Sequence, residues 1–287
     1  IRAFCLSRGL GDVYKRQSSS NPNLQQIPSR DLDIKKAIRG LFIPEDECKW
    51  GSFDYASQEP RWLAHYCANA GESYRHPLID DVVSSYQEGK ADFHQMVADM
   101  AKITRKEAKT VNLGIMYGMG RKKLADTLAI TENESIELLA TYNEKVPFVK
   151  DLATRVSNFA QQKGIIRTHL GRKCRFEMYE PRGFNSKRPL PLKDAVKEYQ
   201  NVQRAYTYKA LNRLIQGSSA DQTKKAMVDC YAAGLCPMLT VHDELCFNVQ
   251  NEEEIEKIKD IMMNCVPDLK VPFDVDVELG NNWGEVG

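Results

Sequence analysis

The polar centre of Leu239–Val249, LTVHDELCFNV, is the first candidate for chemistry in this chain. Apolar residues flank His242, Asp243 and Glu244, so two short β-prone runs meet at a tight turn, as in a hairpin. The tip of this hairpin would hold two carboxylates and an imidazole next to a buried sheet. Because Asp is common in turns, the triplet alone is typical of a solvated turn. A catalytic metal pair requires a second carboxylate on another strand end.

Asp54 provides such a carboxylate. It lies at the end of the apolar run Trp50–Tyr55, which predicts a strand, and the following segment becomes helical, with Glu59 and Arg61 near its start. The ordinary alternative is an Asp that caps the following helix. If Asp54 and Asp243 converge, they form a set of hard oxygen ligands of the kind that Mg²⁺ prefers.

The densest signal begins at Thr104, which forms a Thr-x-x-Glu capping box with Glu107 and so predicts the start of a helix. Two cations, an apolar residue and a phenol then recur every four residues along one side of that helix, at Arg105, Lys109, Leu113 and Tyr117. This order suits an elongated ligand with phosphates at one end and a flat ring at the other. A basic amphipathic helix is the alternative.

Amide side chains form two further groups. Ser18–Arg30 is a loop or linker, because Pro22 and Pro28 exclude a helix interior. Its amides could reach acceptors in the minor groove of a duplex, although a plain linker explains the composition equally well; they are Asn23, Gln25 and Gln26. Asn212 and Gln216 are four residues apart and share one face of a predicted helix.

Composition places the chain among ordinary soluble proteins, with 287 residues, 42% hydrophobic and 28% charged. The eight cysteines have no metal-type spacing, and no apolar run is long enough for a membrane span. Net charge is +1, but Lys163–Arg213 contains 13 Lys or Arg against 4 Asp or Glu. This basic block predicts a polyanionic partner, with a solvated charged helix pair as the alternative.

The elements that must position these residues follow from pattern. We expect a strand at Ile38–Ile43 beside Trp50–Tyr55, and a long helical stretch, Asp194–Tyr231, interrupted near Gln216–Ser219. Val271–Leu279 alternates apolar and acidic residues, which predicts a half-buried strand. Residues 1–17 resemble translated adapter sequence, so we interpret them as a non-native leader, an assembly artefact, and exclude them from fold prediction.

Three motifs then show a resemblance. DYASQEPR (Asp54–Arg61), RKEAKTVNLGIMYG (Arg105–Gly118) and VHDEL (Val241–Leu245) resemble the three polymerase motifs of family A DNA polymerases, the DNA polymerase I type. SSSNPNLQQIP, DFH, IQGSSAD and NNWGE are also similar to that family. The resemblance covers nearly all of Ser18–Gly287 in the right order, and its variants look most like those of phage and other viral members.

The resemblance implies an α+β fold, a right-hand polymerase palm of antiparallel sheet and helices with helical fingers. The palm would comprise residues 18–100 and 167–287, and the fingers residues 101–166. In the family the thumb precedes the first motif, so we expect the thumb to be missing here, together with any 3′–5′ exonuclease domain.

The implied activity is template-directed DNA synthesis, in replication or repair, by nucleotidyl transfer from dNTPs to a primer 3′-OH. Two Mg²⁺ ions, or Mn²⁺ instead, would be the cofactors. The resemblance assigns Asp54 and Asp243 as the bridging metal ligands, the backbone carbonyl of Tyr55 as a further ligand and Glu244 as a weaker contributor. Lys109 would also donate a proton to the leaving pyrophosphate.

The resemblance also assigns nucleotide and DNA contacts. Residues implied in nucleotide binding are Glu59, His94, Arg105, Lys109, Leu113 and Tyr117, where Glu59 would crowd the sugar 2′ position. Residues implied in primer–template binding are Asn23, Gln25, Gln26, Arg61, Asn212, Gln216 and His242. Leu113 departs from the family's usual Phe or Tyr, and a branched apolar chain cannot stack on the nucleotide as a ring does.

Two alternatives stay open. Without a thumb, the chain could be a non-catalytic fragment that binds primer–template DNA. A metal-dependent phosphodiesterase could use the same carboxylates, but it has no evident use for the Arg–Lys–Leu–Tyr helix. The expected partners are primer–template DNA and dNTPs, with accessory replication proteins as further candidates and no membrane. The expected location is the cytoplasm of a bacterial cell or a phage-infected host.

Overall fold

The computed structural model describes residue 27 and residues 31–71, 76–89, 92–116, 119–183 and 188–286. Four predicted site residues, Asn23, Gln25, Gln26 and Tyr117, lie outside these ranges. The chain divides into two compact units. Unit 1 consists of Ile1–Arg61 and Gln216–Gly287, and unit 2 of Trp62–Ile215, so the second unit is an insertion in the first.

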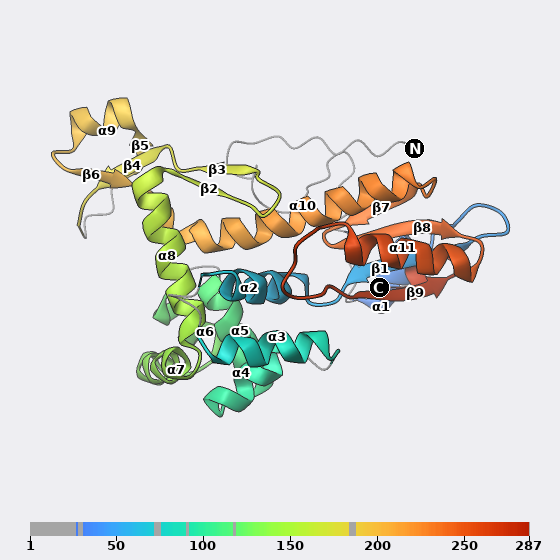
Figure 1. Ribbon diagram of the computed structural model, residues 1–287, viewed down its shortest axis with the longest axis horizontal. Coiled ribbons are helices and arrows are strands. Elements are labelled where there is room, and N and C mark those ends of the chain that lie inside the picture. Colours follow the sequence, from blue (N-terminus) through green and yellow to red (C-terminus); the bar gives the residue numbers. More distant parts are fainter. Residues whose placement is uncertain are drawn as a thin grey trace. The chain divides into compact units, whose positions relative to one another are not determined.

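Unit 1 is built on a four-stranded antiparallel sheet of order β7-β8-β1-β9 (Figure 1). Its strands are β1 (Lys49–Tyr55), β7 (Pro237–Val241), β8 (Glu244–Val249) and β9 (Val275–Gly280). The predicted hairpin is confirmed, since β7 and β8 pair through Val241 and Glu244 and leave two residues at the tip. The predicted strand at Val271–Leu279 begins later, at Val275.

Strand β1 lies between β8 and β9, and its alternating side chains serve two different cores. Phe53 and Tyr55 are buried on one face, and Tyr55 donates a hydrogen bond to the carbonyl of Met262 on helix α11 (Glu252–Asn264). Gly51 lies on that face too, where a Cβ would come within 2.5 Å of Val249, so the strand packs closely only because no side chain is present there.

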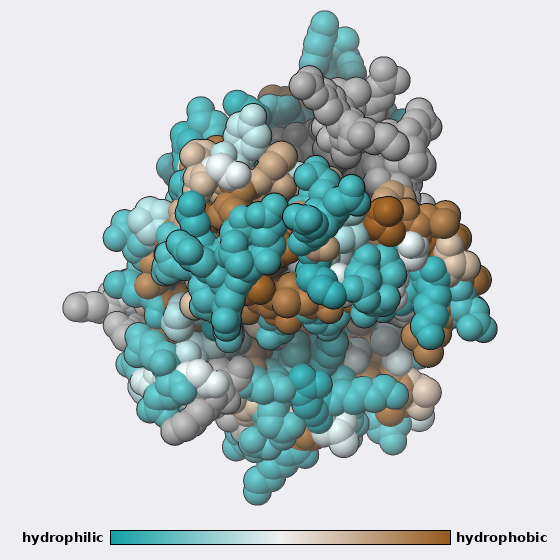
Figure 2. Space-filling model, turned by 90° about the vertical axis from the view of Figure 1, so that its right-hand side faces the viewer, coloured by the Kyte–Doolittle hydropathy of each residue, from teal (hydrophilic) through white to brown (hydrophobic). Residues whose placement is uncertain are grey.

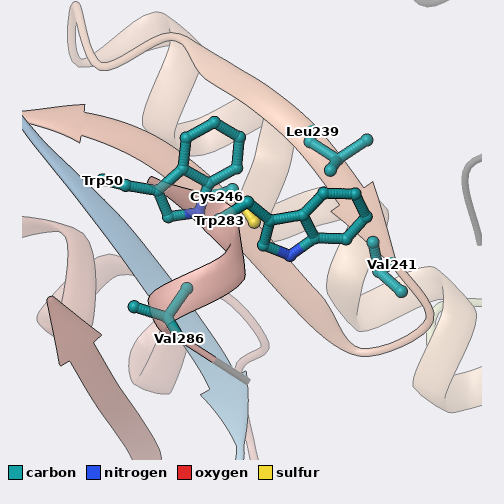
Figure 3. Close-up of a cluster of buried hydrophobic side chains, with 6 residues drawn as sticks. All are labelled: Trp50, Leu239, Val241, Cys246, Trp283 and Val286. Carbon is teal, nitrogen blue, oxygen red and sulfur yellow. The ribbon is translucent and has the colours of Figure 1, made fainter. Parts of the chain in front are cut away.

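The other face of β1 carries an apolar cluster around two tryptophans (Figure 3). Trp50 and Trp283 stack with ring centroids 6.2 Å apart, and Phe42 meets Trp283 edge-on at 5.4 Å. Leu239, Val241, Cys246 and Val286 complete the buried set. This cluster anchors the end of β1 that is distant from Asp54.

Helices complete unit 1, and in Figure 1 α11 lies across the sheet. They are α1 (Leu32–Arg39), the second part of α10 (Ala210–Ala232), α11 (Glu252–Asn264) and the 3₁₀ turn η4 (Trp283–Glu285). Asn251 caps α11, because its side chain accepts a hydrogen bond from the Glu254 N–H.

The strand predicted at Ile38–Ile43 is wrong, because helix α1 continues to Arg39 and the following residues form a turn and an extended segment. Asp31 caps this helix by accepting hydrogen bonds from the Asp33 and Ile34 N–H groups. A local cap therefore prevails over the β-prone composition that follows it.

Unit 2 is mainly helical and carries two small sheets. Its helices are the second part of α2 (Gln58–Ala68), α3 (Leu78–Gln87), α4 (Phe93–Ala101), α5 (Arg105–Met116), α6 (Arg121–Leu128), α7 (Glu132–Lys145), α8 (Pro147–Lys163), α9 (Leu192–Glu198), the 3₁₀ turn η3 (Thr207–Lys209) and the start of α10. Its strands are β2 (Ile165–Arg167), β3 (Lys173–Arg175), β4 (Met178–Pro181), β5 (Leu190–Pro191) and β6 (Val202–Arg204).

Two predictions about helices have opposite outcomes. The capping box of α5 is confirmed, since Thr104 Oγ1 accepts from the Glu107 N–H and the Glu107 carboxylate accepts from the Thr104 N–H. The predicted interruption near Gln216–Ser219 is wrong, because α10 is continuous through these residues. The break lies earlier, between α9 and α10, where β6 and η3 are found.

Surface composition agrees with these folds. Hydrophilic residues cover most of the face shown in Figure 2, with hydrophobic residues in smaller groups between them. Among the described residues, no helix combines the length and apolar character needed to cross a membrane.

Candidate active site

A row of acidic residues crosses three neighbouring strands of unit 1. Asp54 on β1 is the register partner of Glu244 on β8 and of Asp276 on β9. Residues directly opposite each other in an antiparallel pair project from the same face of a sheet. Three carboxylates therefore lie at one end of the sheet, on the face from which Trp50 projects at the other end of β1.

Asp243 joins this row from the tip of the β7–β8 hairpin. It follows His242, whose φ of 59° lies in the left-handed region, which is uncommon for residues other than glycine. Such backbone strain persists only where the surrounding structure imposes it, and strained residues cluster at functional sites. The pairing of β7 with β8 on both sides of the tip imposes the left-handed conformation of His242. Asp243, the next residue, lies close enough to Asp54 to affect its pKa.

The pKa of Asp54 is raised by burial and by these neighbouring carboxylates. Desolvation of the carboxyl group, followed by the negative charges of Asp243, Glu244 and Asp276, raises the pKa of Asp54 to about 7. Among the described residues, no Lys or Arg forms an ion pair with Asp54.

Glu244 is held differently from the two aspartates. Its Oε1 accepts a 2.6 Å hydrogen bond from Ser52 Oγ and a longer one from the Cys246 thiol. Ser52 is buried two residues before Asp54 and so projects from the same face of β1. Glu244 is thus tied to the sheet by Ser52 and Cys246.

A pocket opens beside Asp243 in unit 1. It is lined by Gln58, Glu59, Gln216, Ser219, Ala220, Thr223, His242 and Asp243. Three of the predicted contacts, Glu59, Gln216 and His242, therefore share one pocket with a predicted metal ligand. Glu59 and Gln216 are both buried polar residues, so each places a polar side chain in the pocket lining.

Gln58 fixes the start of α2 against α10. Its Nε2 lies within hydrogen-bond distance of the Ser219 carbonyl, Gln222 Oε1 and Thr223 Oγ1, at 3.1–3.3 Å. Because Gln58 is almost fully buried, these bonds replace water and position the next residue, Glu59, at the pocket. Sequence inspection gave Gln58 no role, since an amide beside a motif has no distinctive spacing.

Arg61 and Asn212, two of the predicted DNA contacts, are largely buried. Arg61 is buried, and its guanidinium donates hydrogen bonds to the carbonyls of Ala56 and Pro272, which fixes the turn between β1 and α2. Asn212 is buried one turn before Gln216 on α10.

In unit 2, the predicted stripe on α5 is solvent-facing at its cationic end. Arg105 and Lys109 are exposed and Leu113 is half-buried. Arg105 Nε forms a 2.6 Å ion pair with Asp92, which also caps α4 by accepting from the backbone N–H groups of His94 and Gln95. Burial alone would raise the pKa of Asp92, but the hydrogen bonds from Arg105 and from these N–H groups lower it.

His94 is a buried neutral imidazole. Burial, together with the positive charges of Lys109 and Arg105, lowers the pKa of His94 to about 4 against the opposing charge of Asp92. Its Nδ1 lies 3.0 Å from the side-chain nitrogen of Asn112, which the sequence did not single out. The sequence signal that could have indicated Asn112 is its position immediately before Leu113 in the motif.

Among the described residues, no group of three or more His, Cys, Asp or Glu has the geometry of a complete metal site. The pair Asp54 and Asp243 would thus supply part of a coordination sphere. Oxygen ligands from the backbone, water or a bound phosphate would have to complete it.

Comparison with known protein families identifies the family of this chain. The family model for DNA polymerase family A matches residues 13–285. The chain belongs to DNA polymerase family A. The predicted family is therefore confirmed, and it accounts for the three motifs, two of which contribute to the acidic row and the pocket of unit 1 and one of which forms α5 in unit 2.

Family A relatives include a DNA-directed DNA polymerase of Pseudomonas phage M6, 36% identical over 96% of this chain and 44% of the phage protein. DNA polymerase I of Bacillus caldotenax is 35% identical over 93% of this chain and 29% of that protein. The chain thus spans less than half the length of these relatives.

A solved structure confirms the fold class. The POL domain of Pol1 from M. smegmatis, in complex with DNA primer-template and dNTP, matches with a TM-score of 0.73 and 29% identity. The match covers 94% of this chain and 46% of that chain. The fold is therefore α+β, with the antiparallel sheet and helices of a polymerase palm and fingers, as predicted.

Proposed function

We propose that this chain carries out template-directed DNA synthesis, in replication or repair, by transferring a nucleotidyl group from a dNTP to the 3′-OH of a primer. The primer 3′ oxygen forms a bond to the α-phosphorus, the bond from that phosphorus to the bridging oxygen breaks, and pyrophosphate leaves. The convergence of Asp54 and Asp243 in a chain of family A carries the proposal.

Two Mg²⁺ ions, with Mn²⁺ as an alternative, fit this acidic row. The negative charge that raises the Asp54 pKa has no basic partner at Asp54 among the described residues, and bound cations would relieve the repulsion. Asp54 and Asp243 would hold the ions, with the Tyr55 backbone carbonyl, and Glu244 would contribute less because Ser52 holds it. When bound, the ions would neutralise negative charge on the attacking and leaving oxygens.

The fingers residues would bind the triphosphate. Arg105 and Lys109 would pair with its phosphates, and the Lys109 ammonium would give a proton to the leaving pyrophosphate. His94 would donate a hydrogen bond to a phosphate oxygen as a neutral ring. Leu113 and Tyr117 would lie beside the nucleotide base, where Leu113 supplies contact without ring stacking.

Pocket residues would select the sugar and hold the DNA. Glu59, buried beside Asp243, would crowd a 2′-hydroxyl and so favour deoxyribose. The primer and template would contact Gln216 and His242 in the pocket, and further contacts are proposed at Asn23, Gln25, Gln26, Arg61 and Asn212. Accessory replication proteins are further proposed partners.

Primer extension tests the proposal. The purified chain is incubated with a labelled primer–template, four dNTPs and Mg²⁺, and extension dependent on template sequence is the expected result. Asp243→Asn should lower the rate by about a thousandfold or more, because one of two bridging carboxylates is lost. Asp260→Asn, on the exposed side of α11, is the matched control and should leave extension intact.

Three other results would each contradict a different part of the proposal. Extension that survives Asp243→Asn would remove the metal assignment. Primer–template binding without extension would favour a non-catalytic binding fragment, and strand cleavage would favour a phosphodiesterase.

A further inference from the structure

Three buried side chains of unit 2 form a chain of hydrogen bonds that joins three helices. His94 on α4 meets Asn112 on α5, with 3.0 Å between His94 Nδ1 and Asn112 Nδ2, and Tyr142 on α7 donates its hydroxyl proton to Asn112 Oδ1. Asn112 and Tyr142 are fully buried and His94 almost so. The three groups therefore satisfy one another without bulk water.

The Tyr142 hydroxyl determines which atom donates and which accepts in both of these hydrogen bonds. Tyr142 has no other hydrogen-bond partner among the described residues, so its buried O–H must donate to the Asn112 carbonyl oxygen to remain satisfied. The Asn112 NH₂ group then faces His94 and donates to Nδ1. In the reversed arrangement Asn112 would donate to the tyrosine oxygen and leave the hydroxyl proton buried without an acceptor.

An acceptor at Nδ1 places the ring proton of a neutral histidine on Nε2. Burial and the nearby cations keep this ring neutral, since they lower the pKa of His94 to about 4. No described residue forms a hydrogen bond with His94 Nε2. The Nε2–H is therefore a donor available to a ligand, on a ring beside Arg105 and Lys109.

We propose that Asn112 and Tyr142 are positioning residues that fix the Nε2–H tautomer of His94, so that this ring donates a hydrogen bond to a phosphate oxygen of the incoming nucleotide. The inference rests on the proposed function for its ligand, but the tautomer can be measured without it. A neutral donor near Arg105 and Lys109 binds the phosphate without adding a third charge that burial would oppose.

The tautomer is tested directly by ¹⁵N NMR of the full chain labelled at histidine, with the His94 resonances assigned by their loss in His94→Gln. At neutral pH we expect a protonated Nε2 and an unprotonated Nδ1. Tyr142→Phe frees Asn112 to rotate, so both nitrogen shifts should move toward the average of the two tautomers. Tyr199→Phe is the matched control, because it removes a hydroxyl that donates to the Arg188 carbonyl elsewhere in unit 2.

A proton on Nδ1 in the unmodified protein would overturn the proposal, and so would shifts that Tyr142→Phe leaves unchanged in a folded variant. A thermal melt of each variant establishes folding. If Tyr142→Phe does not fold, the tautomer of the unmodified protein still decides the point. Because no catalysis is involved, these results are independent of whether the chain synthesises DNA.

Nucleotide kinetics supply a second test. Tyr142→Phe should raise the KM for dNTP about two- to tenfold, the factor expected for one weakened hydrogen bond, with a smaller change in kcat. In a His94→Gln background, where the side chain has no tautomer to fix, Tyr142→Phe should have no further effect. An equal effect in both backgrounds would show a purely structural role and overturn the proposal.

Discussion

Asp54 in unit 1 and Asp92 in unit 2 are the same residue type in opposite surroundings. Asp92 accepts hydrogen bonds from Arg105 and from two backbone N–H groups, which lower its pKa despite burial. Asp54 faces three other carboxylates, and its pKa is raised to about 7. Asp92 is compensated by Arg105 and backbone N–H groups, whereas Asp54 has no ion-pair partner among the described residues. This difference is what our proposal of a cation at Asp54 rests on.

The acidic surroundings of Asp54 depend on the sheet of unit 1, against which the tryptophan cluster packs. Trp283→Ala removes a fully buried ring that stacks on Trp50, and we expect a loss of about 3–5 kcal/mol in the free energy of unfolding. Denaturant unfolding measures the loss, and hydrogen exchange should place it in β1 and β8. Leu279→Ala, at a half-exposed side chain, is the control. A loss below about 1 kcal/mol would mean that the tryptophan cluster does not hold the acidic row.

The second prediction concerns the cations of unit 2. Lys109→Ala should lower kcat/KM for dNTP incorporation about a hundredfold, because a charged group aimed at the phosphates is lost. Lys106→Ala, on the same helix and equally exposed, should change it less than about threefold. Single-nucleotide incorporation measures both. Equal effects would show that α5 acts through its overall charge rather than through one stripe.

The third prediction concerns the pH dependence of Asp54. A carboxyl whose folded pKa is raised from 3.8 to about 7 destabilises the folded state at pH 8, and this penalty disappears as pH falls below 4. Asp54→Asn should therefore raise the Tm at pH 8 by a few degrees but not at pH 3.5. Added Mg²⁺ should raise the Tm of the unmodified protein and not of the variant.

Asp260→Asn is again the control for this experiment. The same gain at both pH values would mean that the neighbouring carboxylates do not set the Asp54 pKa.

The smallest expected effect concerns the start of α5. Thr104→Ala removes the capping box and should cost about 1 kcal/mol of stability, with faster hydrogen exchange in the first turn of the helix. Thr127→Ala, inside α6, removes only a side-chain bond to the preceding turn and should be nearly neutral. If both have the same effect, the cap does not position Arg105.

Features set by neighbouring residues could be predicted from the sequence. The hairpin at Val241–Glu244 and the Thr104 cap follow from local patterning and are confirmed. The strand at Ile38–Ile43 was wrong because β-prone composition competes with a local helix cap at Asp31. Motif resemblance supplied the family.

Contacts between distant residues could not be predicted from pattern. Nothing local indicates that Asp276 would join Asp54, or that Ser52 would hold Glu244. The same holds for Gln58 and for the Asn112–Tyr142 bond, because hydrogen-bonding partners far apart in sequence have no fixed spacing. The roles assigned to individual site residues stay predictions.

The place of β1 in its sheet has a consequence for biosynthesis. Its two neighbours, β8 and β9, begin about 190 and 220 residues after β1 ends, beyond all of unit 2. Until both strands have been synthesised, β1 has two unpaired edges and the acidic row does not exist. A truncation that removes β8 or β9 would therefore remove the acidic row, although both strands lie far from Asp54 in the sequence.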